Sequence, residues 1–125
     1  MIEQKHRAIW RRKGRRYLPG TVRIPEPSSP NTKNVDHTLA AEVEIPKEGA
    51  EGVLVCCGGA SAGYTVFMKD GKLHWEHNWF EEGRYLVSST EAVPPGHRVV
   101  SPRSRWIEKA SSAPAVQSRY AWAKR

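Results

Sequence analysis

Histidines are the side chains best suited to hold a metal or to move a proton near neutral pH, and the chain has five. His74 and His77 are three positions apart, and on a strand, where neighbouring side chains alternate, this spacing sends them to opposite faces. His74 and Glu76 do share a face, at a spacing seen in strand-borne zinc sites, but the sequence offers no third ligand beside them. We therefore predict no metal and no cofactor.

Nucleophiles and paired carboxylates are present, but in patterns that do not build a catalytic site. Cys56 and Cys57 are adjacent, so on a strand they point to opposite faces, where a disulfide between them would be strained. We interpret them as two small residues that fill a strand. No serine lies in a nucleophile elbow, and Glu42 and Glu44 are more typical of a solvated sheet face than of acid–base chemistry. The prediction is that the chain has no catalytic residue.

Exposed aromatic rings could instead bind a sugar by stacking on it. Trp79 and Phe80 lie in an expected loop directly after a predicted hairpin, and His74 is a candidate neighbour. These three residues form the candidate ligand-binding site, and its ligand would be a carbohydrate. The alternative, which we favour, is that Trp79 and Phe80 cover the edge of the fold or dock onto a catalytic domain.

The residues that must position these side chains centre on the stretch 64–78, where two runs of strand-favouring residues flank Asp70-Gly71. That pair tolerates positive φ at both central positions of a type I′ turn, so it predicts a β-hairpin. A two-residue turn also fixes the register: Lys69 opposite Lys72, Met68 opposite Leu73, Phe67 opposite His74, Val66 opposite Trp75 and Tyr64 opposite His77. The resulting apolar face consists of Tyr64, Val66, Met68, Leu73 and Trp75, with His77 at its end. Because an isolated hairpin is marginal in water, other strands must cover this face.

Further strands are expected on both sides of the hairpin. A Pro-Gly turn at residues 19–20 should lead into a short strand, and an uninterrupted apolar run at 53–57 predicts a strand buried on both sides or covered by a loop. Additional strands are expected at residues 21–24, 38–45, 84–88 and 97–100. Strands that recur roughly every eight to twelve residues, with turns and no helices between them, predict an all-β fold, an antiparallel β-sandwich.

The length of 125 residues allows one domain with a modest core. We place the sandwich at residues 17–100, a basic linker or frayed helix at 1–16, and a basic tail without periodicity, non-native or disordered, at 101–125. No stretch approaches the ~20 apolar residues of a membrane span, and the basic N-terminus lacks the apolar run of a secretory signal. The sequence thus predicts no membrane association and, by default, a cytoplasmic location.

The net charge of +7 raises the question of nucleic-acid binding. The basic residues belong to the two ends of the chain: residues 1–23 hold eight Lys and Arg against Glu3, and residues 101–125 hold six against Glu108. Residues 24–100 hold six Lys and Arg against eleven Asp and Glu, a difference of −5. A phosphate-tracking patch is expected on the folded domain, so this distribution argues against nucleic acid as a partner, although a basic arm stays open as an alternative.

Several segments together resemble the C-terminal region of bacterial arylsulfatases. The resemblance covers about residues 17–100 and is carried by residues 19–26, 30–34 with His37, 41–46, 49–55, Gly58-Gly59 and 69–73. It implies a region that follows an alkaline-phosphatase-like catalytic domain and folds like part of a concanavalin- or laminin-G-like jelly roll. The parent activity would be the hydrolysis of sulfate esters, and the implied partner is the sulfatase catalytic domain.

The catalytic apparatus of that family does not carry over. Arylsulfatases mature the Cys or Ser of a Cys-x-Pro-x-Arg motif to formylglycine, whereas Cys56 is followed by Cys57-Gly58-Gly59. Members also continue beyond the position of Val100 with strands that complete the sheets, and residues 101–125 do not resemble them. We therefore expect a truncated, non-catalytic accessory sandwich. The alternatives are a carbohydrate-binding module and, further, a nucleic-acid binder with a basic arm.

Overall fold

The structure is a computed structural model that describes residues 14–33, 35–59, 61–80, 82–104 and 121–123. The chain forms two compact units, residues 1–35 and 36–125. Most of the linker predicted at 1–16 and most of the tail predicted at 101–125 lie outside the described residues. No helix among the described residues is long and apolar enough to cross a membrane.

The described part of the first unit contains one short 3₁₀ helix, η1 (Glu26–Ser28). The predicted Pro-Gly turn is present: Gly20 has a φ of 82°, and the Thr21 N–H donates to the Leu18 carbonyl over 3.2 Å. The strand predicted at residues 21–24 is wrong. Arg23 has a φ of 56°, which bends the chain out of the extended conformation.

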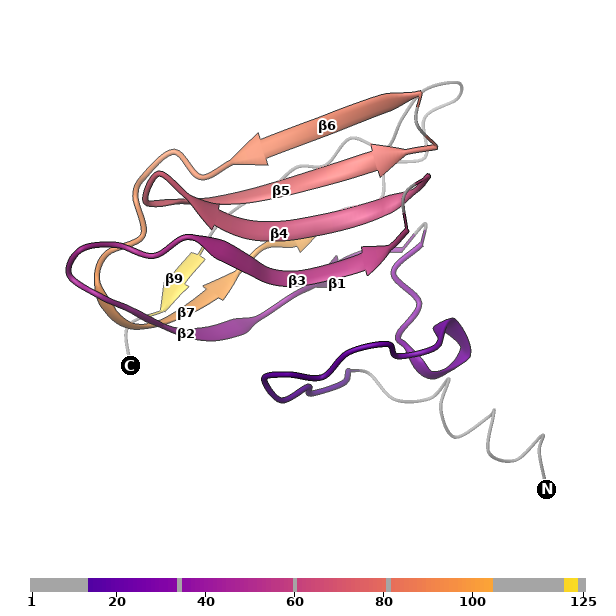
Figure 1. Ribbon diagram of the computed structural model, residues 1–125, viewed down its shortest axis with the longest axis horizontal. Helices are drawn as coiled ribbons and strands as arrows, with labels where there is room; N and C mark the ends of the chain where they lie inside the picture. Colours follow the sequence, from indigo (N-terminus) through magenta and orange to yellow (C-terminus); the bar gives the residue numbers. More distant parts are fainter. Residues whose placement is uncertain (1–13, 34, 60, 81, 105–120, 124–125) are drawn as a thin grey trace. The chain divides into compact units, whose positions relative to one another are not determined.

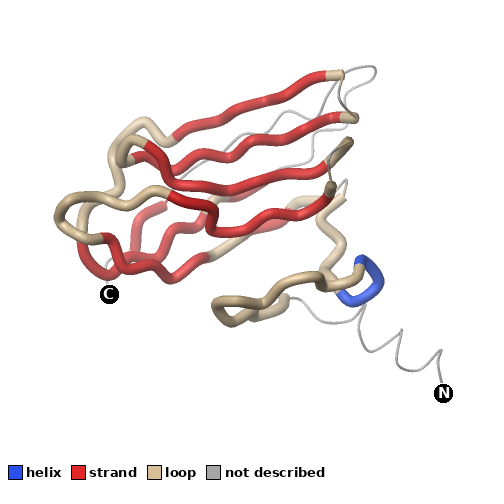
Figure 2. The backbone as a smooth tube through the Cα atoms, in the orientation of Figure 1, coloured by secondary structure: helices blue, strands red, loops and turns tan. Residues whose placement is uncertain are grey.

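The second unit is built from strands. Their bounds are β1 (His37–Thr38), β2 (Ala41–Ile45), β3 (Gly52–Gly58), β4 (Gly63–Lys69), β5 (Lys72–Trp79), β6 (Gly83–Ser88), β7 (Gly96–Ser101), β8 (Arg103–Ser104) and β9 (Ala121–Ala123). They form a four-stranded sheet in the order β3-β4-β5-β6, a three-stranded sheet in the order β2-β7-β9, and the pair β1-β8 (Figures 1 and 2). Every pairing is antiparallel, so the all-β antiparallel fold is confirmed.

The hairpin β4–β5 has the predicted register. Asp70 and Gly71 have φ values of 50° and 71°, as a type I′ turn requires, and Lys69 pairs with Lys72 directly beyond them. The remaining predicted pairs are also observed, out to Tyr64 opposite His77. The alternation that follows from this register points one face of the hairpin into the protein.

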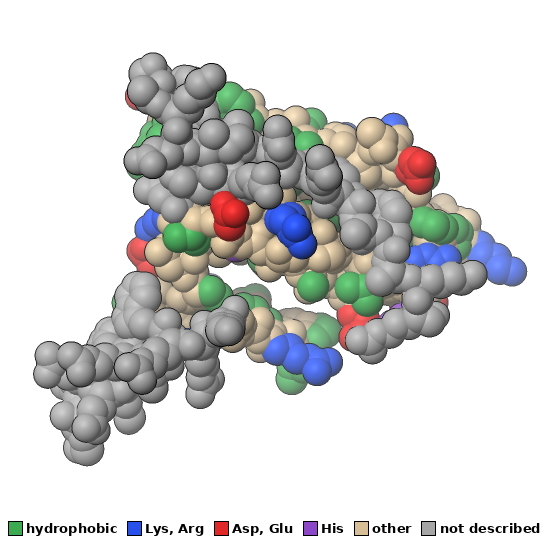
Figure 3. Space-filling model, turned by 180° about the vertical axis from the view of Figure 1, so that it is seen from behind, with side chains coloured by type: hydrophobic (Ala, Val, Ile, Leu, Met, Phe, Trp, Pro, Cys, Tyr) green, Lys and Arg blue, Asp and Glu red, His purple; other side chains and the backbone are tan. Residues whose placement is uncertain are grey.

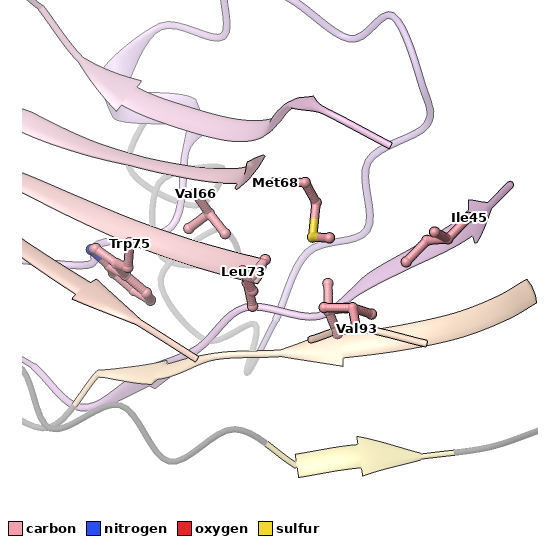
Figure 4. Packing of buried hydrophobic residues seen from close by; sticks show 7 residues of the cluster. Ile45, Val66, Met68, Leu73, Trp75 and Val93 are labelled. Carbon is pink, nitrogen blue, oxygen red and sulfur yellow. The ribbon is translucent and has the colours of Figure 1, made fainter. Parts of the chain in front are cut away.

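A single hydrophobic core lies between the two larger sheets (Figure 4). The hairpin contributes four buried side chains, and the second sheet contributes Ile45 and Val100. The buried hydrophobic residues are Ile45, Val66, Met68, Leu73, Trp75, Val93 and Val100. Two sheets that share one core make a β-sandwich, as the sequence predicts.

The connection after β6 is fixed to the hairpin by a buried serine. The Ser89 N–H donates to the Leu73 carbonyl over 2.8 Å, and the Leu73 N–H donates back to Ser89 Oγ over 3.2 Å. The Ser89 hydroxyl donates to the Glu91 carbonyl, so this buried hydroxyl both donates and accepts a hydrogen bond. The Val93 N–H donates to the Gly71 carbonyl and its side chain is buried, which extends the core beyond the strands.

Two predicted strands differ from the structure. The strand expected at 38–45 is split into β1 and β2, because β1 pairs with β8 while β2 pairs with β7. The prediction that the run at 53–57 is a buried strand is wrong. The run forms β3, which is the edge of its sheet, and Val53 is 62% exposed. An apolar run reports hydrophobicity but not the number of neighbouring strands, so it cannot separate an edge from a centre.

Pairing continues past the boundary predicted at residue 100. β7 ends at Ser101, the pairing of β1 with β8 uses Arg103 and Ser104, and β9 pairs with β7. Pro102, between β7 and β8, is fully buried. These residues therefore belong to the body of the sandwich in the described part of the chain.

Candidate functional site

Aromatic side chains gather at one end of the four-stranded sheet. Alternation along β5 places Trp75, His77 and Trp79 on the face that turns toward the core. Tyr64 lies opposite His77 on β4, and His37 on β1 approaches from outside this sheet. We call these five residues and Phe80 the aromatic cluster.

Ring contacts join the aromatic cluster in two groups, one around the buried Trp75 and one around Trp79. The centroid distances are 5.1 Å for Tyr64–Trp75, 5.6 Å for His37–Trp75, 6.0 Å for His37–Tyr64, 6.1 Å for His77–Trp79 and 5.3 Å for Trp79–Phe80. The last pair is edge-to-face, at 85°. These separations lie in the range in which aromatic pairs add to simple burial.

Exposure increases outward along the aromatic cluster. Trp75 is 1% exposed, Trp79 is half-buried, and Phe80 is 63% exposed. Phe80 is therefore the most accessible ring of the aromatic cluster, His37, Tyr64, His77 and Trp79 are partly accessible, and Trp75 is a core residue.

The turn after β5 sets the position of Phe80. Trp79 was expected in a loop but is the last residue of β5, paired with Gly83, and the Glu82 N–H donates to its carbonyl over 2.9 Å. Phe80 has a φ of 47°, which is uncommon for a bulky side chain. A side chain at position 83 would lie 3.0 Å from Tyr85 Oη, so the absence of a Cβ at Gly83 leaves room for the Tyr85 ring beside Trp79.

His74 does not join the other two candidate residues. It lies on the opposite face of β5, where its ring stacks on Phe67 at 5.0 Å. Its Nε2 is 3.0 Å from the Lys69 carbonyl and its Nδ1 is 2.7 Å from Ser88 Oγ. Since a carbonyl oxygen can only accept, Nε2 is the donor in its contact with Lys69. The structure thus brings Trp79 and Phe80 together and separates His74, as the odd spacing of five positions implies on a strand.

His77 is the titratable group whose environment the aromatic cluster changes most. Removal from water lowers the pKa of His77, and the neighbouring His37 lowers it further, because a second positive charge beside it is unfavourable. The folded sandwich therefore favours the neutral imidazole at position 77.

A pH dependence of stability follows from this lowered pKa. Below the ordinary value of 6.5, the unfolded chain binds a proton that the folded chain excludes, so the free energy of unfolding should fall as the pH decreases. Above 6.5 this contribution is fully present, and below the folded-state pKa the loss reaches its limit. Urea titrations at a series of pH values, with His77→Gln as the variant, would measure it.

The matched control is His74→Gln on the other face of the same strand. That variant keeps His77 and should retain the pH dependence, whereas His77→Gln should reduce it. An unchanged pH profile in His77→Gln would contradict the assignment.

A histidine that the sequence analysis left aside lies between two carboxylates. His97 on β7 is within 3.0 Å of Glu42 through Nε2 and within 3.4 Å of Glu44 through Nδ1. All three side chains are exposed on the outer face of the three-stranded sheet. Both ring nitrogens are engaged on an open surface, so we interpret the group as a surface ion-pair network rather than as an acid–base site.

The described residues offer no enclosed site for metal or acid–base chemistry. Among them, no group of three His, Cys, Asp or Glu residues is placed to hold a metal ion. An open depression of about 270 Å³ lies between β2 and β3, lined by apolar side chains with Glu44 and Glu51. It contains no residue of the aromatic cluster.

On the face of the molecule seen from behind, charged side chains of both signs are interspersed (Figure 3). Seen from behind, basic and acidic side chains alternate with hydrophobic ones over the coloured part of the molecule (Figure 3). The basic run at residues 11–13 lies outside the described residues.

Comparison of this chain with models of protein families, with curated proteins and with solved structures finds no match. The class of protein is defined by the fold itself, an antiparallel β-sandwich with an aromatic cluster at one end of its larger sheet.

Proposed function

We propose that the chain is a non-catalytic accessory sandwich, the C-terminal portion of an arylsulfatase-like sulfuric ester hydrolase. Its role is structural: it packs against a sulfatase catalytic domain rather than carrying out chemistry. The observation that supports this most directly is where the residues of the resemblance lie in the fold.

The segments of the resemblance from residue 41 onward occupy positions on which the sandwich depends, whereas residues 19–26 and 30–34 belong to the first unit. Asp70-Gly71 forms the turn that fixes the central register, and Gly58 opens the connection from β3 to β4 with a φ of 109°. Residues 41–46 contain all of β2, and residues 49–55 contain the first half of β3. A shared pattern made of framework positions, without the motif for the reaction, is typical of an accessory domain.

An activity assay tests whether the chain is non-catalytic. The purified chain should not hydrolyse an aryl sulfate, with or without calcium, because its described residues carry no converging nucleophile and base. Turnover above that of a blank preparation would overturn the proposal.

A binding assay tests whether the chain packs against a sulfatase catalytic domain. An arylsulfatase catalytic domain that lacks its own C-terminal region should elute together with this chain and melt at a higher temperature in its presence. Separate elution and an unchanged melting temperature would remove the accessory role. Reading the DNA upstream of the coding region for a Cys-x-Pro-x-Arg motif gives an independent check.

A second candidate function is carbohydrate binding, favoured by the edge-to-face pair of Trp79 and the exposed Phe80. Titration calorimetry with sulfated and neutral glycans should then detect heat that Trp79→Ala and Phe80→Ala abolish. His74→Ala is the control, since His74 lies on the other face of the sheet and should leave binding intact. Absence of heat at the highest soluble glycan concentration would exclude this candidate.

A further inference from the structure

The strand β3 has one sheet edge without a partner in the described part of the chain. It pairs with β4, and the sheet order β3-β4-β5-β6 ends there. Val53 is 62% exposed, and Cys56 and Cys57 are exposed and free. An edge strand offers a row of backbone donors and acceptors to any further strand.

Two other edge strands, β2 and β6, carry charges that oppose such pairing, and β3 does not. β2 has Glu42 and Glu44 on its solvent side, and β6 has Arg84, which pairs with Glu76. The seven residues of β3 are Gly, Val, Leu, Val, Cys, Cys and Gly, with no charge and no proline. Charged residues and prolines are the usual protection of a sheet edge.

A bulge limits how much of β3 can pair regularly. The register shifts between Val53 and Val55, after which pairs with β4 follow in order to Gly58. The regular stretch therefore runs from Val55 to Gly58, and Leu54 lies at the bulge. In two copies related by a two-fold axis perpendicular to the sheet, the outer faces of both sheets lie on the same side. Residues that oppose each other then point to the same face, so they are separated by an even number of positions in the sequence.

We propose that β3 is a homodimerisation edge, where two copies of this chain pair antiparallel with Cys56 opposite Cys56. In this register Leu54 faces Gly58 and Val55 faces Cys57, so all five paired residues lie within β3. A centre at Cys57 would use only residues 56–58 of the strand. The result is one sheet that continues through both copies.

A second copy fits this edge because the pairing opposes no like charges. The nearest charged residue, Glu51, precedes β3 and lies outside the paired stretch. A cationic or anionic partner strand would find no complementary side chain on β3, which is uncharged throughout. This inference concerns a different surface from the proposed accessory role and does not depend on it.

The opposed thiols make the pairing detectable. Residues directly opposite each other on antiparallel strands have Cα atoms about 4.5 or 5.5 Å apart, and both distances fall within the range that a disulfide spans. With oxidised glutathione as oxidant, one Cys56 thiolate attacks the disulfide and releases one glutathione thiol. The Cys56 thiolate of the other copy then attacks the mixed disulfide, forming the intermolecular bond and releasing the second thiol.

The test compares sedimentation of the reduced chain over a wide range of concentration with that of two lysine variants. Cys56 and Leu86 occupy the same cross-strand row, Cys56-Thr65-Glu76-Leu86, at opposite edges of the sheet. Cys56→Lys should weaken dimerisation about fivefold or more, because it opposes two like charges, whereas Leu86→Lys should not weaken it. A monomeric wild-type chain, or equal loss in both variants, would overturn the proposal.

Cross-linking separates the two cysteines without disturbing the fold. After incubation with oxidised glutathione, the wild-type chain and Cys57→Ser should give a covalent dimer on a non-reducing gel, and Cys56→Ser should not. Cross-linking through Cys57 alone would exclude the register centred on Cys56. If a sulfatase domain binds this edge instead, adding that domain should dissociate the dimer. Wild-type dimers in the absence of that domain would still support the proposal.

Discussion

Replacement of Trp75 by alanine should lower the free energy of unfolding by about 3–5 kcal/mol, the usual cost of deleting a large aromatic side chain from a core. Trp75 is 1% exposed and its ring contacts Tyr64 and His37. A domain of this size has a total stability of about 5–15 kcal/mol, so the variant should be close to unfolding at room temperature. Urea unfolding followed by far-UV circular dichroism would measure the loss.

Two further variants separate the packing of Trp75 from its polar atom. Trp79→Ala, on the same strand and face but half-buried, should lose much less stability. Trp75→Phe should also cost less than alanine, because it keeps most of the ring volume and removes the buried Nε1, which has no hydrogen-bond partner. If Trp75→Ala were no more destabilised than Trp79→Ala, the core position of Trp75 would be wrong.

The centre of the fold was predictable because its information is local. The Asp70-Gly71 turn fixes which residues of β4 and β5 oppose each other, and alternation then assigns Trp75 to the core. The same reasoning could not find the pairing of β1 with β8, since His37 and Ser104 are far apart in sequence and neither segment is long enough to show a period.

Edges and interruptions are where sequence reasoning failed, for related reasons. The apolar composition of β3 indicates a strand but carries no information on a neighbour beyond β4, so its exposure was missed. The residues around Arg23 favour an extended strand, but Arg23 itself adopts a positive φ, which interrupts the extended conformation. Tertiary neighbours decide both outcomes, and a single sequence does not specify them.

The candidate site shows the same division. The sequence analysis grouped His74 with Trp79 because it expected Trp79 in a loop, whereas Trp79 belongs to β5 and the odd interval places the two on opposite faces. The approach of His37 to Trp75 and Tyr64 was not predictable, since it depends on how β1 packs against the larger sheet. The core position of Trp75 is therefore predictable from local sequence, whereas the neighbours that complete the aromatic cluster are a consequence of packing.

The connection from β3 to β4 should be the most sensitive turn of the sandwich. Gly58 pairs with Gly63, and the Gly59 N–H donates to the Ala62 carbonyl over 2.9 Å, so the two strands are joined very closely. Gly63 has a φ of 142°, and a Cβ there would lie 2.1 Å from the Cys57 carbonyl oxygen. No side chain fits at this position unless the backbone of the turn moves.

Gly63→Ala should therefore lower the free energy of unfolding by about 3 kcal/mol, combining a strained backbone of about 1–3 kcal/mol with displacement of the Cys57 carbonyl. The control is Gly59→Ala in the same turn, where an added Cβ would meet no atom within 4 Å and should change stability little. Urea unfolding of both variants measures the difference. Equal stability of the two would mean that the turn can relax, and the close pairing of Gly58 with Gly63 would then not be what holds β3 against β4.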